Sequence, residues 1–252
     1  MARMVLVHGA FGGAWCWEPV VGGLEAAGHT VETFDLPGSG DDPTPVEEVT
    51  LDAYADRICE VLAARPEPAV LVGHSMGGVA ITQAAGRSPE RIAKLVYVAA
   101  FLPRDGQSLI DLTHLPEGSD DQIQANLVVS GDPPVAEMPR DAIRDAVYQR
   151  CPEDVAAKLA ERRGPQAVAP FATPVSLPDP DAVAAIPHAY VIATDDRSIP
   201  PALQRRMVRE HGVTEVVEIE ADHSPMHSAT DELVAILDRI AAGRTTAGAQ
   251  VA

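Results

Sequence analysis

A five-residue pattern, G-x-S-x-G, spans residues 73–77 and centres on Ser75. It directly follows the apolar run 69–72, and Gly78 then opens a helix-like segment over 79–85. A serine on such a strand-to-helix turn projects its hydroxyl from the end of a sheet, and free amides at the helix start can face an oxyanion. The pattern therefore makes Ser75 a candidate nucleophile, although a glycine-rich packing turn would give the same five letters.

A serine needs two partners to act as a nucleophile near neutral pH: a base that takes its proton and an acid that orients the base. On this kind of turn the acid and then the histidine follow the serine along the chain, each on a loop after a later strand. Asp196 follows the predicted strand 189–194, and His223 follows the predicted strand 215–219. We therefore predict a catalytic triad of Ser75, Asp196 and His223.

Two other aspartates compete for the role of the acid. Asp195 is adjacent to Asp196, and because neighbouring side chains diverge, only one of them can face the imidazole. Position relative to the strand end favours Asp196, which leaves Asp195 as a solvated turn residue or as the cap of the next helix. Asp222 precedes His223 directly and is expected only to form a turn, because sequence neighbours seldom reach each other's ring nitrogen.

The predicted base competes with seven other histidines. His8 and His74 lie in glycine-bordered turns, where we expect them to support the backbone. His227 lies four residues after His223, the spacing of two metal ligands on one helical face. Pro225 argues against a regular helix there, and no glutamate stands where a metalloprotease base would. We therefore expect no metal site, and we place His227 at a helix start or in a pocket wall.

The tetrahedral oxyanion of acyl transfer needs fixed N–H donors. The amide of Met76, next to the serine, is one candidate, and the glycine-rich loop 8–13 should supply the other through the amide of Ala10. This loop does not form the G-x-G-x-x-G pattern of dinucleotide-binding proteins, although Asp35 follows the second strand as that fold requires. An oxyanion hole is therefore favoured over a nucleotide-binding reductase.

Short apolar runs alternate with helix-like patterns along the chain, which predicts parallel strands joined by crossover helices. The predicted strands are 4–7, 30–35, 69–73, 94–99, 189–194 and 215–219. The predicted helices are 15–27, 51–64, 76–86, 201–211 and 231–241. The alternation breaks down between the fourth and fifth strands, where proline and acidic residues are frequent and helical pieces are predicted at 140–149 and 152–163.

We predict one discontinuous core domain, made of residues 1–103 and 187–242, with residues 104–186 inserted as a lid. A lid of this kind shapes the pocket and excludes water, whereas the alternative is a loosely packed surface excursion. Residues 243–252 are small and polar and are predicted to be a flexible tail. The length of 252 residues suits one α/β domain with an insertion.

Composition excludes several partner classes. The net charge of −18 argues against binding nucleic acid or anionic membrane, both of which need clustered Lys and Arg. The three widely spaced cysteines indicate reduced thiols in a cytoplasmic protein, with neither a disulfide framework nor zinc spacing. No signal peptide or membrane-spanning stretch is expected. The composition leaves a homodimer open.

Motifs along nearly the whole chain resemble the α/β-hydrolases, and within them the branch of plant methylesterases and hydroxynitrile lyases. The motifs that carry the resemblance are His8–Gly9–Ala10 with Trp15 and Trp17, Asp35 to Gly40, Ala99 to Pro103, Cys151 to Asp154, Thr194 to Pro200, and Ala221 to His223. The resemblance implies an α/β-hydrolase fold, with a mostly parallel six-stranded sheet flanked by helices and an inserted helical lid. It also implies the same triad and no cofactor.

Departures from the branch separate its activities. The lyases resemble one another in having a threonine where this chain has Gly9 and a lysine where it has Ser224. A lysine would stabilise a departing cyanide, which a serine cannot do, so the resemblance favours ester hydrolysis over cyanohydrin cleavage. Phe11 and Gly12 replace the cysteine and histidine usual in the family, which implies a reshaped pocket. We expect Phe11, Phe101 and Ser224 to contact substrate, although core packing explains the phenylalanines equally well.

The sequence therefore predicts a serine hydrolase that cleaves small carboxylic esters through an acyl-enzyme. Cofactor-free perhydrolysis, C–C bond hydrolysis and, less favoured, hydroxynitrile cleavage would leave almost the same residues in place. A ligand-binding receptor with negligible turnover is the alternative from outside the enzymes. A purely structural protein is least expected, because it would not need three catalytic groups in the right order.

Overall fold

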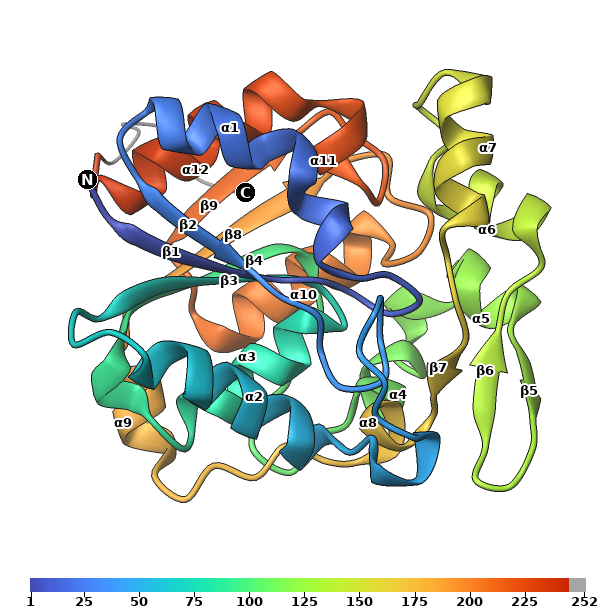
Figure 1. The fold of residues 1–252 in the computed structure, drawn as a ribbon, viewed down its shortest axis with the longest axis horizontal. Coiled ribbons are helices and arrows are strands. Elements are labelled where there is room, and N and C mark those ends of the chain that lie inside the picture. Colours follow the sequence, from blue (N-terminus) through green and yellow to red (C-terminus); the bar gives the residue numbers. More distant parts are fainter. Residues whose placement is uncertain (245–252) are drawn as a thin grey trace.

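The centre of the computed structural model, which describes residues 1–244, is a six-stranded sheet (Figure 1). Its strand order is β2-β1-β3-β4-β8-β9, and every neighbouring pair is parallel. The strands are β1 (Arg3–Val7), β2 (Thr30–Thr33), β3 (Ala69–Ser75), β4 (Ile92–Ala100), β8 (His188–Ala193) and β9 (Glu215–Ile219). All six predicted strands are present, and the predicted fold class is confirmed.

Two helical layers cover the sheet, which is why its central strands are apolar on both faces. Side chains alternate across a strand, so that Val70 and Val72 face one layer and Leu71 faces the other. The first layer contains α1 (Glu18–Ala26), α11 (Pro225–Ser228) and α12 (Thr230–Ala241). The second contains α2 (Leu51–Ala63), α3 (Gly77–Ala85) and α10 (Pro201–His211). The predicted core helices are thus present, and only α11 was not expected.

Local signals explain where several helices begin and end. The Thr50 hydroxyl accepts a hydrogen bond from the amide of Ala53 and so caps α2. Helix α10 begins with Pro201, whose fixed φ suits the first turn. It ends at Gly212, which has a φ of 63°, a left-handed conformation that glycine adopts without a steric cost. The boundaries of α10 therefore coincide with the predicted ones.

Most of the segment 104–186, from α4 (Leu109–Thr113) to α8 (Ala169–Ala172), forms a cluster of short elements beside one end of the sheet, whereas α9 (Pro180–Ala184) lies apart from it (Figure 1). Between α4 and α8 lie the helices α5 (Gln122–Asn126), α6 (Arg140–Val147) and α7 (Glu153–Glu161). A small antiparallel sheet joins β5 (Val128–Ser130), β6 (Val135–Glu137) and β7 (Gln166–Ala167). Only α6 and α7 were predicted, because the other elements are too short to show a periodicity.

Of the predicted tail 243–252, residues 245–252 lie outside the described part of the chain. Within residues 1–244, the helices are all too short or too polar to cross a bilayer.

Candidate active site

Ser75 is the last residue of β3, and it adopts a φ of 56°, in the left-handed region that non-glycine residues rarely occupy. Glycines make the turn around it possible. A Cβ on Gly77 would lie 2.7 Å from the carbonyl oxygen of His8, and a Cβ on Gly78 only 2.1 Å from that of Phe101. The glycines therefore let α3 approach the neighbouring strands closely enough to hold Ser75 at the strand end.

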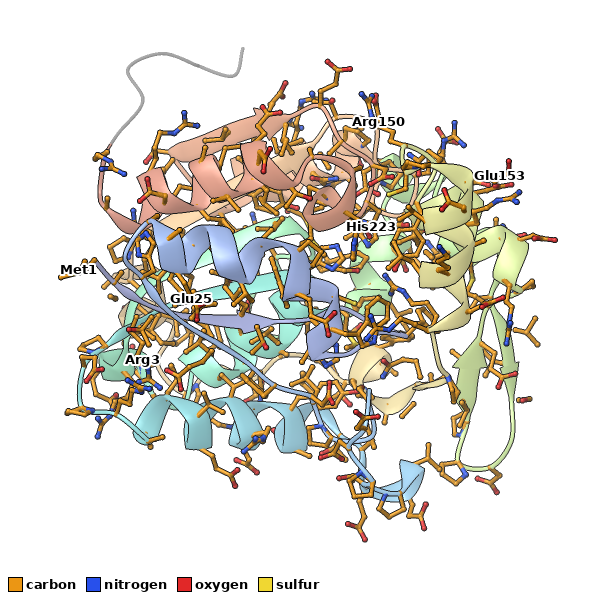
Figure 2. All side chains as sticks on the ribbon, turned by 45° about the horizontal axis from the view of Figure 1, so that its top comes forward. Met1, Arg3, Glu25, Arg150, Glu153 and His223 are labelled. Atoms are coloured by element: carbon orange, nitrogen blue, oxygen red, sulfur yellow. The ribbon has the colours of Figure 1, made fainter. Side chains whose placement is uncertain are left out.

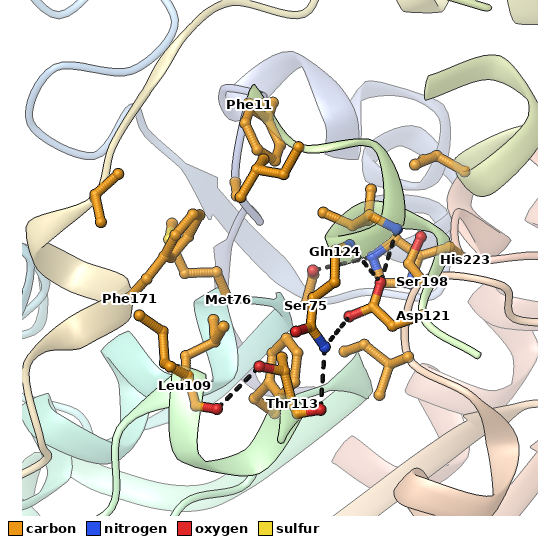
Figure 3. A pocket seen from close by; sticks show the side chains of 18 of the residues that line it. Phe11, Ser75, Met76, Leu109, Thr113, Asp121, Gln124, Phe171, Ser198 and His223 are labelled. Atoms are coloured by element: carbon orange, nitrogen blue, oxygen red, sulfur yellow. Dashed lines mark hydrogen bonds between the residues drawn. The ribbon is translucent and has the colours of Figure 1, made fainter. Parts of the chain in front are cut away.

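The predicted nucleophile, base and acid lie within hydrogen-bond distance of one another (Figure 3). The Nε2 atom of His223 is 2.9 Å from the Ser75 hydroxyl, and its Nδ1 is 2.8 Å from Oδ2 of Asp196. An ionised carboxylate can only accept, so Nδ1–H donates to it and Nε2 is free to accept from the serine. The loops after β3, β8 and β9 thus bring three distant residues into one hydrogen-bonded chain.

The Asp196 carboxylate is buried and accepts four hydrogen bonds. Its Oδ1 accepts from the amides of Ser198 and Ile199, and its Oδ2 accepts from His223 and from the side-chain amide of Gln204. Gln204 is fully buried in α10 and also donates to the carbonyl of Ile199. The sequence analysis missed Gln204, although a polar residue beside apolar positions on the inner face of α10 was a usable signal.

Asp195 and Asp222 have other partners. Asp195 is exposed and forms an ion pair with Arg150. Asp222 is buried, and its carboxylate accepts from the amides of Arg150 and Ser224 and from the Ser228 hydroxyl. In Figure 2, Arg150 projects at the surface whereas His223 lies inside the fold. Both aspartates therefore hold loops beside the triad, Asp195 through its ion pair and Asp222 through a turn.

The two histidines of the glycine-bordered turns support backbone groups. The Nε2 atom of His74 lies 2.7 Å from the carbonyl oxygen of His223, and burial lowers the pKa of His74 well below its usual value. His74 is therefore neutral and donates to the backbone of the predicted base. His8 accepts from the amide of Leu36 through Nε2 and donates to the carbonyl of Gly9 through Nδ1.

His227 lies in the first helical layer, and it is not among the residues that line the cavity containing Ser75. It belongs to α11, and its ring packs near those of Trp15 and Tyr148. Burial lowers the pKa of His227 to about 4, so its imidazole is neutral at physiological pH. Within residues 1–244 there is no group of three potential metal ligands.

The amides of Ala10 and Met76 are the predicted oxyanion donors, and both residues line the cavity that contains Ser75. Neither amide donates a hydrogen bond to another of the described residues. The next residue, Phe11, has a φ of 62°, which turns the loop after β1 sharply. Two unpaired donors thus remain beside the serine.

The end of the inserted segment holds this loop through three hydrogen bonds. The Arg163 guanidinium donates to the carbonyl of Ala10 at 2.7 Å. The amide of Gly164 donates to the carbonyl of Phe11 at 3.0 Å, and the Phe11 amide lies 3.4 Å from Oε1 of Gln166. Arg163 also donates to the Tyr148 hydroxyl. Residues 163–166, which we call the loop clamp, therefore connect the insertion to the predicted oxyanion site.

A cavity of about 410 Å³ opens onto Ser75 and His223. The core contributes Phe11 and Phe101, and the insertion contributes mainly apolar side chains such as those of Leu109, Ile143, Val147 and Phe171. The structure does not bring Ser224 to this cavity: Ser224 is fully buried at the start of α11. Its side chain points into the protein because the Asp222 turn holds its amide.

One acidic lining residue was not singled out from the sequence. Asp121 caps the N-terminus of α5 and is only 5% exposed, although it lines the cavity (Figure 3). Burial raises the pKa of Asp121 to about 6. Its position before an amphipathic segment marks an N-cap, but no sequence pattern indicates that this segment faces the serine.

Comparisons with known proteins agree with the geometry. The family model described as the alpha/beta hydrolase family matches residues 4–236. The chain is 33% identical to Methylesterase 7 of Arabidopsis thaliana (95% of this chain, 96% of the relative) and 32% identical to an Alpha-hydroxynitrile lyase of the same plant, with the same coverage. Among solved structures, the pyrethroid hydrolase PytH superposes with a TM-score of 0.85 at 25% identity, covering 96% of this chain and 98% of PytH.

Proposed function

Because this chain belongs to the alpha/beta hydrolase family, in the branch that contains plant methylesterases and hydroxynitrile lyases, we propose that it is a serine esterase with Ser75, His223 and Asp196 as its catalytic triad. The observation that carries the proposal is the continuous hydrogen-bonded chain from the Ser75 hydroxyl through His223 to Asp196. A family member that merely binds a ligand would not need all three groups in contact.

The reaction begins when the Ser75 hydroxyl attacks the ester carbonyl and His223 takes its proton. Asp196 stabilises the imidazolium that forms, and its other hydrogen bonds keep it oriented. The carbonyl oxygen becomes an oxyanion, which accepts from the amides of Ala10 and Met76. These donors are already in place, so they stabilise the developing charge without reorganising.

The tetrahedral intermediate then collapses. The bond between the carbonyl carbon and the alkoxy oxygen breaks, and His223 gives its proton to the leaving alcohol. Water enters, loses a proton to His223 and attacks the acyl-enzyme, which releases the acid and regenerates Ser75. The segment 104–186 acts as a lid that supplies most of the apolar wall and keeps bulk water from the intermediate.

The cavity suits small, largely apolar esters. Its apolar lining favours hydrocarbon or aromatic acyl and alcohol groups, because their burial removes apolar surface from water. Phe11 and Phe101 line the wall beside Ser75, and Phe11 packs edge to face with Phe171 of the insertion.

A cytoplasmic location fits the three free thiols.

The test is an ester panel assayed with the wild type and with Ser75→Ala. We expect the variant to lose at least about a thousandfold in kcat, because the remaining binding site and oxyanion donors cannot replace the nucleophile. Ser224→Ala is the matched control, since its hydroxyl is fully buried next to His223 but lies outside the cavity. If Ser75→Ala cleaved the esters of the panel as fast as the wild type does, Ser75 would not be the nucleophile.

A further inference from the structure

The active-site cavity contains a carboxylate that the proposed mechanism does not use. Asp121 lies on the side of the pocket formed by His223 and Ser198, as Figure 3 shows. The amide of Gln122 donates to the carbonyl of Arg197 at 2.8 Å, which ties the start of α5 to the loop that carries the triad acid. Asp121 is therefore held beside the triad and not on a loosely attached part of the insertion.

The carboxylate of Asp121 is incompletely satisfied. Its Oδ1 accepts from the amides of Ile123 at 2.7 Å and Gln124 at 3.1 Å, and these bonds cap α5. Its Oδ2 has one long contact among the described residues, 3.4 Å from the side-chain amide of Gln124. An ionised carboxylate offers about four acceptor positions. Oδ2 therefore has capacity for a further donor from the cavity.

The capping role alone does not account for an aspartate here. Asparagine, serine or threonine caps a helix about as well, and none of them carries a charge into an apolar cavity. The pKa of Asp121, raised by burial to about 6, is still below neutral pH, so the group remains mostly ionised there. Arg163 also lines the cavity, but its guanidinium is bonded to Ala10 and Tyr148 and forms no ion pair with Asp121.

We propose that Asp121 selects esters whose alcohol part carries a protonated amine, which would donate to Oδ2. The inference rests on the proposed ester hydrolysis. In that reaction His223 protonates the leaving alcohol, so a group beside His223 faces the alcohol part and not the acyl part of the substrate. A charge-assisted hydrogen bond in a mainly apolar cavity is stronger than a neutral one and adds specificity.

A pair of esters of nearly the same shape isolates the charge. Dimethylaminoethyl acetate and isoamyl acetate differ in a nitrogen for a CH group, and alkylamines keep their proton at neutral pH. We expect Asp121→Asn to lower the ratio of kcat/KM for the amino ester to that for isoamyl acetate by about tenfold, the effect of one charged hydrogen bond. Asn retains the helix cap, so the change acts on charge.

Asp120→Asn is the matched control. Asp120 is the adjacent, exposed aspartate, and its substitution changes the net charge equally without touching the cavity. We expect it to leave the ratio unchanged. Asp121→Ser, which also keeps a capping oxygen, should lower the ratio like Asp121→Asn, and melting temperatures confirm that each variant is folded. A ratio equal to that of the wild type in both Asp121 variants overturns the proposal.

A binding measurement separates this proposal from the proposed function. In a Ser75→Ala background, calorimetric titration should show tighter binding of the amino ester than of isoamyl acetate, and adding Asp121→Asn should remove the difference. Cleavage of esters by Ser75→Ala would contradict the triad assignment. The difference in affinity between the two esters would still test the role of Asp121. Equal binding of the two esters, or no binding of the amino ester, overturns the role of Asp121.

Discussion

Two residues beside the reaction centre, Ser75 and Phe11, have a positive φ although neither is glycine. Such a conformation costs on the order of 1–2 kcal/mol and persists only where the surroundings enforce it. Hydrogen bonds enforce it at both positions: the carbonyl of Ser75 accepts from the amide of Phe101, and that of Phe11 accepts from Gly164. Both strained residues line the same cavity.

At the same scale, the acid assignment predicts unequal effects for two neighbouring aspartates. Asp196→Asn should lower kcat by about a thousandfold or more, because an amide at this position no longer fixes the imidazole tautomer or stabilises its charge. Asp195→Asn should change kcat by less than about threefold, since it removes only a surface ion pair with Arg150. Steady-state kinetics on one ester decide between them, and equal losses would contradict the assignment.

Among the secondary-structure elements, the loop clamp connects the insertion to the proposed oxyanion site. Its three hydrogen bonds are made to Ala10 and Phe11. The preceding residue, Gly9, packs against the nucleophile, since a Cβ on Gly9 would lie 2.7 Å from the Cβ of Ser75. The loop after β1 is thus confined between the nucleophile on one side and the insertion on the other. A movement of residues 163–166 would displace the Ala10 amide, so we expect the insertion to affect catalysis as well as the shape of the pocket.

Arg163→Met tests this connection. We expect it to lower kcat by about tenfold while KM changes little, because a misplaced donor weakens transition-state binding more than substrate binding. Arg163→Lys should restore part of the loss, since it keeps a donor. Arg162→Met is the control: Arg162 lies over the Trp15 ring and pairs with Glu18, without a bond to the loop. An equal effect of both methionine variants would contradict a specific role for Arg163.

At the scale of the whole molecule, the proposed catalytic residues lie together at the carboxyl ends of the strands. All six strands are parallel, so the loops after β1, β3, β8 and β9 meet at the same end of the sheet, and part of the insertion lines the cavity there. Helices on both faces keep the central strands rigid. The cavity therefore forms between the sheet, which holds the proposed triad, and an insertion of short elements, which supplies most of the apolar lining.

A buried carboxylate in the cavity also affects the stability of the whole protein. Burial raises the pKa of Asp121 from 3.8 to about 6, so the folded state holds its proton more tightly than the unfolded state does. The stability that this proton contributes is full below 3.8 and is lost as the pH rises through about 6. The titratable or permanently charged groups that line the cavity with it are His114, Arg163 and His223.

Asp121→Asn should therefore be more stable than the wild type at neutral pH, by on the order of 2 kcal/mol. The difference should shrink as the pH falls below 6, where the wild-type carboxyl becomes protonated. Urea unfolding of both proteins at several pH values measures it. A constant difference across that range would show that Asp121 does not titrate as its burial implies.

The sequence by itself determined the strands, the core helices and the identity of three candidate catalytic residues. This was possible because hydrophobic periodicity and turn residues act over a few neighbours, and because the Ser75, Asp196 and His223 motifs each follow a recognisable strand. The order of serine, acid and histidine along the chain then allowed the three residues to be assigned to one predicted triad.

Only the tertiary structure decided which side chains meet across the cavity. Arg163 on Ala10 and Asp121 beside His223 are contacts between segments far apart in the chain. Contacts of this kind depend on how the insertion folds onto the sheet, which local sequence patterns do not encode.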